Sequence, residues 1–206
     1  MSFNINEFKS QGLVYGGARP ALFRVVFSAP QISGLNLQAV GSLSFKCRAA
    51  ELPASTVAAV EVPYFGRKIK VAGDRTFADW QVTMMNDEDF SARTLFEAWS
   101  NGLNRLVSNV RDPGATNESK GIGSYKVDMQ VQQFGKDGEI IRGYNIVGAF
   151  PTEIGAIALD WDNQNQIETF PVTFAYDYWE PVSAASSKIG AGKSFYNSTS
   201  PGRNPN

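Results

Sequence analysis

The sequence predicts a mainly β protein, a β-sandwich or open barrel of about eight strands with one helix packed on its side. Three observations support this fold class. Apolar and polar residues alternate with a period of two in several segments, Gly, Pro, Asn and Asp separate those segments, and one segment alone has the period of an amphipathic helix. With 206 residues, 43% of them hydrophobic and 12% aromatic, the chain is large enough for one packed domain.

The first half of the chain contains four expected strands. Residues 1–20 are polar and glycine-bearing, and we expect them to form an N-terminal arm. Strands are then expected at residues 21–27, 43–48, 67–71 and 80–84, because apolar side chains there alternate with polar ones. The apolar face of the second of these strands would consist of Leu43, Phe45 and Cys47.

One helix is expected directly after the fourth strand. Residues 86–89 read Asn-Asp-Glu-Asp and provide an N-cap and an acidic first turn, which the helix dipole favours. Gly102 is expected to end the helix. Its apolar face would consist of Phe90, Thr94, Leu95, Ala98 and Trp99. Residues 108–123 then have the composition of a loop.

The second half of the chain predicts a hairpin and a last strand. Residues 125–131 alternate, Asp137-Gly138 is a strong turn signal, and residues 140–150 would form the partner strand. A last strand is expected at 168–179, with one face made of Phe170, Val172, Phe174, Tyr176 and Tyr178. We therefore expect the β domain to span 21–182, followed by a flexible tail, 183–206, rich in Ser, Gly and Asn.

The residue types argue against common enzyme classes. The chain has no histidine, which excludes Ser-His-Asp and Cys-His catalysis and the usual zinc sites. Residues 190–194 read Gly-Ala-Gly-Lys-Ser, but Ser187 replaces the first glycine of a phosphate-binding loop. The oxygen-bearing run 160–168 lacks the central glycine of a calcium loop. We expect no catalytic residue, no cofactor and no metal.

The expected compartment follows from one cysteine and two missing segments. Cys47 is alone, so no internal disulfide can form, which favours folding in a reducing cytosol. The first ten residues lack the features of a secretory signal, and no run of about 18 apolar residues occurs. No membrane insertion by this chain is therefore expected.

Charge is distributed unevenly along the chain. Residues 1–75 contain 9 basic and 4 acidic side chains, a net charge of +5, whereas residues 76–206 contain 10 basic and 16 acidic ones, a net charge of −6. Opposite charges at two ends of one molecule favour head-to-tail association. The alternative is two unrelated solvated faces.

A second indication of self-assembly is a long insert at residues 49–66. The insert is weakly apolar and lies between two strands that each have a polar face. Connections of this length are uncommon unless they are functional, and exposed apolar segments usually mark an interface. The alternative is a hairpin folded back on its own core.

Two long motifs resemble one family. Residues 71–80 read Val-Ala-Gly-Asp-Arg-Thr-Phe-Ala-Asp-Trp and are followed by Val82-Thr83 and by 85–87, Met-Asn-Asp. The second motif comprises Leu-Asp-Trp-Asp at 159–162, Ile167, Thr169-Phe170, Val172-Thr173 and Asp-Tyr-Trp-Glu at 177–180. Together with Leu52-Pro53 and Arg-Lys-Ile at 67–69, these resemble the signatures of T-even-type tail-tube proteins of contractile-tailed bacteriophages. The resemblance covers about residues 18–181, and the chain departs from it at the N-terminal arm and after Pro181.

The resemblance implies a structural virion protein of the tail. Hexameric rings would close a barrel of about 24 strands, about four from each subunit, and stack inside a contractile sheath. Partners would be other copies, the sheath protein, the baseplate and the tape-measure and terminator proteins. Double-stranded DNA would pass through the tube without specific binding, and assembly would take place in the cytoplasm of the host bacterium.

Within that architecture, the apolar insert and the alternation of the strands predict two sets of assembly residues. The 49–66 segment would contact the adjacent ring through Leu52, Pro53, Val57, Val60, Pro63, Tyr64 and Phe65. Polar strand faces would line the channel, namely Ser44, Lys46, Arg48, Lys68, Lys70, Lys126, Asp128, Gln130 and Gln132. For each strand an outer solvent face is the alternative. Since unpaired cations would retard DNA, acidic neighbours are expected beside the basic residues.

Three other functions are weighed against this one. The inner tube of a tailocin or of a phage-derived contractile injection system would have the same architecture. A monomeric sugar-binding β-sandwich could stack sugars on Trp80, Trp99, Trp161 and Trp179. A glycosidase that uses two carboxylates is possible in principle.

Overall fold

A computed structural model describes residues 5, 17–28, 30, 32, 37–110, 125–162 and 164–183. The predicted mainly β class is confirmed, with two helices instead of one in the described part of the chain. The elements are β1 (Phe23–Val26), α2 (Leu37–Lys46), β2 (Cys47–Ala50), β3 (Ser55–Tyr64), β4 (Arg67–Phe77), β5 (Trp80–Met85), α3 (Ser91–Leu103), β6 (Val127–Phe134), β7 (Ile140–Ile154), β8 (Thr169–Ala175) and β9 (Tyr178–Ser183). Most of the expected N-terminal arm, the loop at 111–124 and the tail after Ser183 lie outside the described residues.

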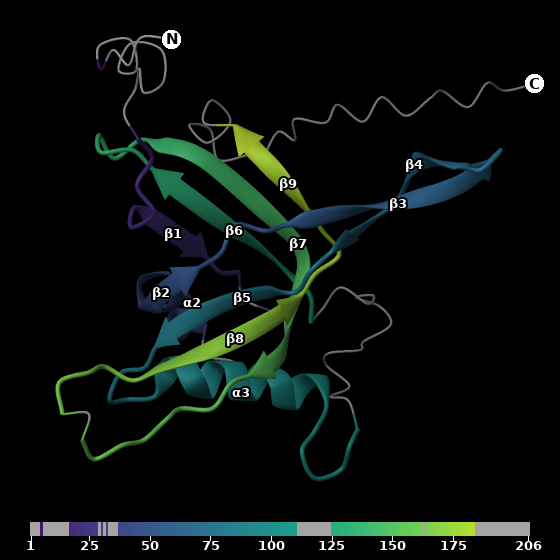
Figure 1. The fold of residues 1–206 in the computed structure, drawn as a ribbon. Helices are drawn as coiled ribbons and strands as arrows, with labels where there is room; N and C mark the ends of the chain where they lie inside the picture. The colour runs from purple at the N-terminus through teal and green to yellow at the C-terminus, as the bar shows by residue number, and fades with distance from the viewer. Residues whose placement is uncertain are drawn as a thin grey trace, which may run out of the picture.

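One curved sheet forms the body of the molecule. It has seven strands: six follow the order β1-β6-β7-β8-β5-β2, and the seventh, β9, pairs with β7 beside this path. Strands β3 and β4 form a separate two-stranded sheet. The body sheet is open, and α3 lies across it (Figure 1). The strands predicted at 21–27, 80–84, 125–131 and 140–150 are all present, with shifted ends.

The 15-residue strand β7 belongs to both halves of the body sheet. Its first part pairs with β6 and β9, and its last part pairs with β8. The change of direction occurs at Gly148, whose φ is 69°, a value that favours glycine. A Cβ atom there would lie 2.3 Å from an Asp177 carboxylate oxygen, so the corner depends on the missing side chain.

The β5–β8 pair shows how the core is built. Val82 faces Val172 and Trp80 faces Phe174 across the two strands, so the apolar side chains of both strands lie on one face. These four side chains are all at least 98% buried. Phe174 also contacts the rings of Phe27, Phe96 and Trp99, and the core therefore joins β1, β5, β8 and α3.

Helix α3 begins and packs differently from the prediction. It starts at Ser91, and Phe90 precedes it in a left-handed conformation, with no side-chain cap on the residue before the helix. The Asp89 carboxylate accepts a hydrogen bond from the Ser91 N–H at 2.9 Å. Phe90 is 46% exposed, and the buried face consists of Ala92, Leu95, Phe96, Trp99 and Gly102. Gly102 lies inside the helix and does not end it. Its lack of a side chain serves packing, because the nearest atom of Ile32 would be 2.6 Å from an added Cβ.

The strand predicted at 43–48 is wrong. Its first four residues end helix α2, and only Cys47 and Arg48 belong to a strand, β2. Leu43 is buried, but Phe45, predicted on the same face, is 76% exposed. The buried spacing is instead Val40 to Leu43, three residues apart, which is helical. Lys46 then ties the end of α2 to the start of α3 through the Asp87 carboxylate and the Ser91 hydroxyl.

The single last strand predicted at 168–179 is two strands. β8 ends at Ala175, and β9 begins at Tyr178 and pairs with β7 on its other side. The break has a cause in Asp177, whose N–H donates to the Val147 carbonyl at 3.0 Å and whose carboxylate pairs with Lys126 at 2.7 Å. Tyr178, predicted on the core face, is therefore 43% exposed.

Candidate assembly surfaces

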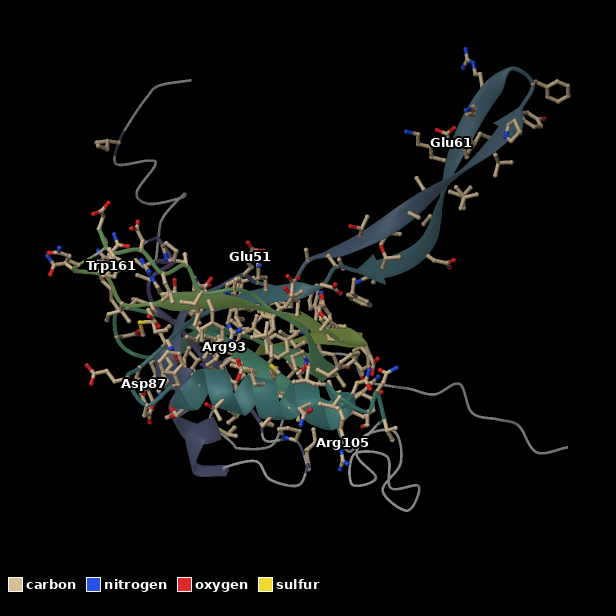
Figure 2. All side chains as sticks on the ribbon, turned by 90° about the horizontal axis from the view of Figure 1, so that it is seen from below. Glu51, Glu61, Asp87, Arg93, Arg105 and Trp161 are labelled. Atoms are coloured by element: carbon tan, nitrogen blue, oxygen red, sulfur yellow. The ribbon has the colours of Figure 1, made fainter. Side chains whose placement is uncertain are left out.

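The hairpin of β3 and β4 is the main candidate for an assembly surface. It leaves the body as a long two-stranded ribbon, with Glu61 far out along it (Figure 2). The predicted strand at 67–71 is therefore real, but it belongs to this ribbon rather than to the body sheet. The segment predicted as an insert, 49–66, supplies the first strand and the turn of a hairpin whose second strand is β4, and this hairpin extends away from the core instead of folding back on it (Figure 1). We call residues 55–77 the arm.

The arm has two different faces. Cross-strand partners share a face, and Val60 faces Val71 while Val62 faces Ile69. These side chains are each about half exposed, at 47–54%. On the opposite face Glu61 faces Lys70, and Lys68 donates to the Glu61 carboxylate at 2.7 Å. The arm thus presents an uncovered apolar face and a charged face.

The tip of the arm holds an aromatic residue in an unfavourable turn position. Phe65 and Gly66 connect Tyr64 to Arg67 and have φ values of 42° and 80°, as a type I′ turn requires. Asn would suit the first position, whereas a left-handed phenylalanine is strained. Phe65 is 91% exposed and forms an edge contact with Tyr64 at 4.6 Å. The turn thus holds an exposed aromatic ring at the tip of the arm, at the cost of a strained backbone.

The residues predicted for the contact between rings are spread along the arm and its root. Val60 and Tyr64 lie on the apolar face, Pro63 lies on the charged face opposite Lys68, and Phe65 forms the tip. Nearer the body, Val57 is opposite Arg75, Leu52 is 48% exposed, and Pro53 is buried. The predicted set does not include Val62, Ile69 and Val71, which also lie on the apolar face of the arm.

Three of the predicted channel residues lie together on the body sheet. Asp128, Gln130 and Gln132 occupy the face of β6 opposite its buried residues. Gln130 donates to the Asn145 side chain on β7 at 2.8 Å, and Gln132 is hydrogen-bonded to Gln130. The Asp128 carboxylate accepts from the Gly148 N–H at 3.0 Å. This surface, which also includes Asn145, is the β6 polar face.

The other predicted channel residues are not on that surface. Ser44 and Lys46 are in helix α2, Arg48 is in β2, and Lys68 and Lys70 are on the arm. Lys126 lies directly before β6 and pairs with Asp177. The expected acidic neighbours are present for three of the cations, as Lys46 pairs with Asp87, Lys68 with Glu61 and Lys126 with Asp177.

The described residues contain little that could support chemistry. They include no group of three or more His, Cys, Asp or Glu residues placed to hold a metal ion. Burial raises the pKa of the Cys47 thiol to about 12, and a smaller opposing effect comes from the backbone of Ala49. A thiol with this pKa is not a nucleophile near neutral pH. None of the helices in the described ranges is long and apolar enough to cross a membrane.

The tryptophans do not form a common platform for sugars. Trp80 and Trp99 are buried, and their indole N–H groups donate to the carbonyls of Glu51 and Tyr125. Trp179 donates to the Ala54 carbonyl at 3.2 Å, and Trp161 is 97% exposed at the end of the molecule opposite the arm (Figure 2). The Gly-Ala-Gly-Lys-Ser run at 190–194 lies outside the described residues.

Comparisons with known proteins agree on one family. The family model for the phage tail tube protein matches residues 18–181. The tail tube protein gp19 of Enterobacteria phage T4 is 41% identical over 166 residues, which cover 79% of this chain and 91% of that protein, and its counterpart in phage T6 is 40% identical over the same shares. The tail tube protein of Serratia phage KSP90 is 21% identical over 84% of this chain and 93% of its own length.

Solved structures share the fold at low identity. A sheath/tube terminator of the extracellular contractile injection system PVC aligns with a TM-score of 0.57 and 15% identity, covering 82% of this chain and 99% of that one. The cap of the anti-feeding prophage aligns with a TM-score of 0.56 and 16% identity, covering 81% and 91%. The family match extends over most of the sequence and includes both motifs, and the chain therefore belongs to the phage tail tube protein family.

Proposed function

We propose that copies of this chain form hexameric rings that stack into the inner tube of a contractile phage tail and conduct DNA during ejection. The observation that carries the proposal is the arm, whose apolar face and aromatic tip project from an otherwise packed body. A face of this kind on a ribbon without a core needs another chain to cover it. Family membership supports the identity of that chain as a second copy.

The size of the channel follows from strand geometry. If each of six subunits contributes about four strands, a barrel of about 24 strands results. At about 4.8 Å between strands and about 40° of tilt, the backbone diameter is roughly 50 Å. Side chains narrow this space, and a DNA duplex still fits.

The β6 polar face is our proposed lining for part of the channel. Its Gln130 and Gln132 are neutral, and Asp128 is acidic, so they offer no cations to hold phosphate groups. Nearby Lys126 is paired with Asp177, which reduces its attraction for DNA. A lining of this type allows DNA to slide without specific binding. Ser44, Lys46, Arg48, Lys68 and Lys70 lie in α2, β2 and the arm and are not part of this proposed lining.

The proposed partners follow from the position of a tube inside a tail. They are the sheath protein around the tube, the baseplate that starts it, and the tape-measure and terminator proteins that set its length. The chain would act as a structural component and not as an enzyme, in a virion assembled in the bacterial cytoplasm. The relatives at 40–41% identity are phage proteins, which favours DNA over the cargo of an injection system.

Shortening the arm tests the proposal. Residues 60–71 are replaced by Asn-Gly, which joins the cross-strand partners Ala59 and Ala72 through a favourable two-residue turn. We expect the shortened chain to keep the thermal unfolding midpoint of the full-length protein within a few degrees, because the arm contributes no core residue. Negative-stain microscopy and sedimentation should then show no tubes under conditions in which the unmodified chain forms them.

The matched control changes the arm without removing its apolar face. Exchanging Lys68 and Glu61, as K68E with E61K, keeps the length and the ion pair on the charged face. This control should still form tubes. Tubes of normal length from the shortened chain would refute the role of the arm, and an unmodified chain that never forms rings or tubes, alone or with baseplate, would refute the function itself.

A further inference from the structure

A pocket lies where the arm joins the body. Its volume is about 420 Å³, and Arg75, Arg142, Tyr144, Trp179 and Pro181 line it. Arg75 comes from β4 in the arm, whereas the other four residues come from β7 and β9. The pocket is therefore shared between the arm and the body, and a group bound in it would contact both.

The lining of the pocket combines two cations with two aromatic rings. Within the described part of the chain, neither Arg75 nor Arg142 forms an ion pair. The rings of Tyr144 and Trp179 meet edge to face at 5.5 Å, and the Arg142 guanidinium lies 5.5 Å from the centre of the Tyr144 ring. Trp179 is held in place by its hydrogen bond to the Ala54 carbonyl. Such a lining favours a carboxylate next to an aromatic group.

The loop between β7 and β8 offers that combination. At its tip Leu159 is 80% exposed and Trp161 is 97% exposed, and acidic residues flank the tryptophan on both sides. The Asp162 N–H donates to the Asp160 carboxylate at 3.1 Å, which fixes a turn around Trp161. From Gly143 to Ser187 the sequence has six carboxylates and no Lys or Arg, so the loop is acidic as a whole. We call residues 159–162 the acidic tip.

Both ends of this loop are anchored to the body, which limits the space that the acidic tip can reach. The Gly155 N–H donates to the Pro171 carbonyl at 2.8 Å, and Arg93 on α3 donates to the Gly155 carbonyl at 2.6 Å. At the other end, the Asn86 amide donates to the Glu168 carboxylate at 3.2 Å. A preordered tip loses less conformational entropy on binding than a mobile one.

The pocket and the acidic tip lie on opposite sides of one molecule. In Figure 1 the β7–β8 loop is on the side away from β9 and the root of the arm, and Figure 2 shows Trp161 at the end opposite the arm. They therefore meet only between two copies. A contact between unlike surfaces of identical chains is heterologous and adds copies head to tail.

We propose that the acidic tip of one copy docks in the Arg75–Arg142 pocket of the next copy. The Asp162 carboxylate pairs with the two guanidinium groups, and Trp161 packs on Tyr144 and Trp179. Because Arg75 belongs to the arm and Arg142 to the body, docking also fixes the arm against the body. The inference rests on the proposed function, since it requires copies to be neighbours in a ring or tube.

A charge exchange in the full-length chain tests the contact. R142E and D162R each place like charges in the contact and should raise the critical concentration for tube formation, measured by sedimentation, at least tenfold. Combined in one chain, they restore one pair of opposite charges and should recover part of the loss, because Arg75 still lines the pocket. K136E and E88R are the matched controls, because they reverse exposed charges that belong neither to the pocket lining nor to residues 159–162, and they should leave assembly unchanged.

A cross-linking experiment gives a second measure of the contact. A cysteine replaces Leu159 in the acidic tip, which leaves Asp162 in place, and another replaces Pro181 in the same chain, and a short bismaleimide should join copies into a ladder on a denaturing gel. The pair L159C and K136C should give no ladder. Cys47 should contribute little to the cross-linking, because burial keeps its thiol protonated.

The outcomes separate this contact from the proposed function. Tubes from the unmodified chain, together with unchanged assembly of R142E and D162R and no ladder, would overturn the contact and leave the tube intact. No rescue in the double variant, without a ladder, would also overturn it. Circular dichroism shows whether R142E is folded. If it is not, the assembly of D162R, whose substitution is in the exposed tip, and the cross-linked ladder test the contact instead. An unmodified chain without rings or tubes overturns both.

Discussion

The arm and the β5–β8 pair have the same sequence pattern in opposite surroundings. Both are antiparallel pairs whose apolar side chains share one face through cross-strand partners. In β5–β8, Val82 and Val172 are 1% and 0% exposed, whereas in the arm Val60 and Val71 are 53% and 51% exposed. Alternation therefore predicts a strand and its two faces, but it does not say which chain covers the apolar one.

The difference between these regions divides the molecule by task. Burial of the β5–β8 face under α3 stabilises the single chain, because apolar area removed from water is the main favourable contribution to folding. The apolar residues of the arm are each about half exposed, so they contribute less to the single chain, and under the proposed function they stabilise the assembly. Substitutions in the two regions should affect different measurements.

The largest expected effect is in the core, at Phe174. Phe174→Ala removes a fully buried ring that contacts four other rings and should lower the free energy of unfolding by about 3–5 kcal/mol. Tyr64→Ala on the arm, where the side chain is 62% exposed, should change it by less than about 0.5 kcal/mol and instead reduce tube formation. Urea unfolding of unassembled protein measures both changes. Similar losses of unfolding free energy from the two substitutions would show that the arm stabilises the single chain as much as the core does.

A smaller effect should appear in the pH dependence of the free energy of unfolding, and its cause is Cys47 in the body. Its pKa is raised from 9.0 to about 12 by burial, so the folded chain keeps a proton that the unfolded chain loses above about pH 9. This contribution to stability is complete below pH 9 and is lost as the pH rises toward 12. Between pH 8.5 and 10.5 the free energy of unfolding of the unmodified chain should fall by about 2 kcal/mol more than that of Cys47→Ala.

Urea unfolding at both pH values measures this difference. Subtracting the curve of Cys47→Ala removes the titration of lysines and tyrosines, which both proteins share. Equal pH dependence in the two proteins would show that the thiol is not held in a buried site. The arm provides the contrast, since its titratable groups are exposed.

The smallest expected effect is at the tip of the arm and has opposite signs in two measurements. Phe65→Asn relieves a left-handed phenylalanine, so it should stabilise the unassembled chain by about 0.5 kcal/mol. It also removes the aromatic tip and should raise the critical concentration for tubes. Phe65→Tyr keeps the ring and serves as the control. Better assembly by Phe65→Asn would show that the strained residue serves no contact.

Much of the body could be predicted from alternation, and the errors have physical causes. The strands at 80–84 and 125–131 follow directly from their patterns, because one face of each is buried. Residues 43–48 also alternate, but Val40 and Leu43 are the buried pair, and a helical spacing of three fits them better. Six residues were too few to distinguish the two periods.

The break after β8 could not be predicted from the sequence. Phe170 to Tyr178 alternate without interruption, yet the chain leaves one half of the sheet and joins the other at Asp177. The cause is a set of contacts with Lys126 and Val147, which are distant in sequence. Local patterns contain no information about such partners.

Part of the set predicted for the contact between rings is exposed in the single chain, and the contact itself stays a prediction. Val60, Tyr64 and Phe65 from the apolar segment 49–66 are exposed on the arm. Ile69 and Val71 are not in the predicted set, because a strand in the arm and a strand in the body have the same alternation. The pocket of Arg75 and Arg142 was not predicted, because its residues come from three strands.

Strand β7 has a mechanical consequence for a tail that must transmit force. It begins with the pocket residues Arg142 and Tyr144 and ends at Ile154, just before the loop that bears the acidic tip. Joined head to tail, copies would pass tension or compression along one continuous peptide backbone per subunit, with non-covalent joints only between subunits. Because β7 changes direction at Gly148, its 15 residues span less than the roughly 50 Å of a straight strand, and this span would set the distance between the two joints.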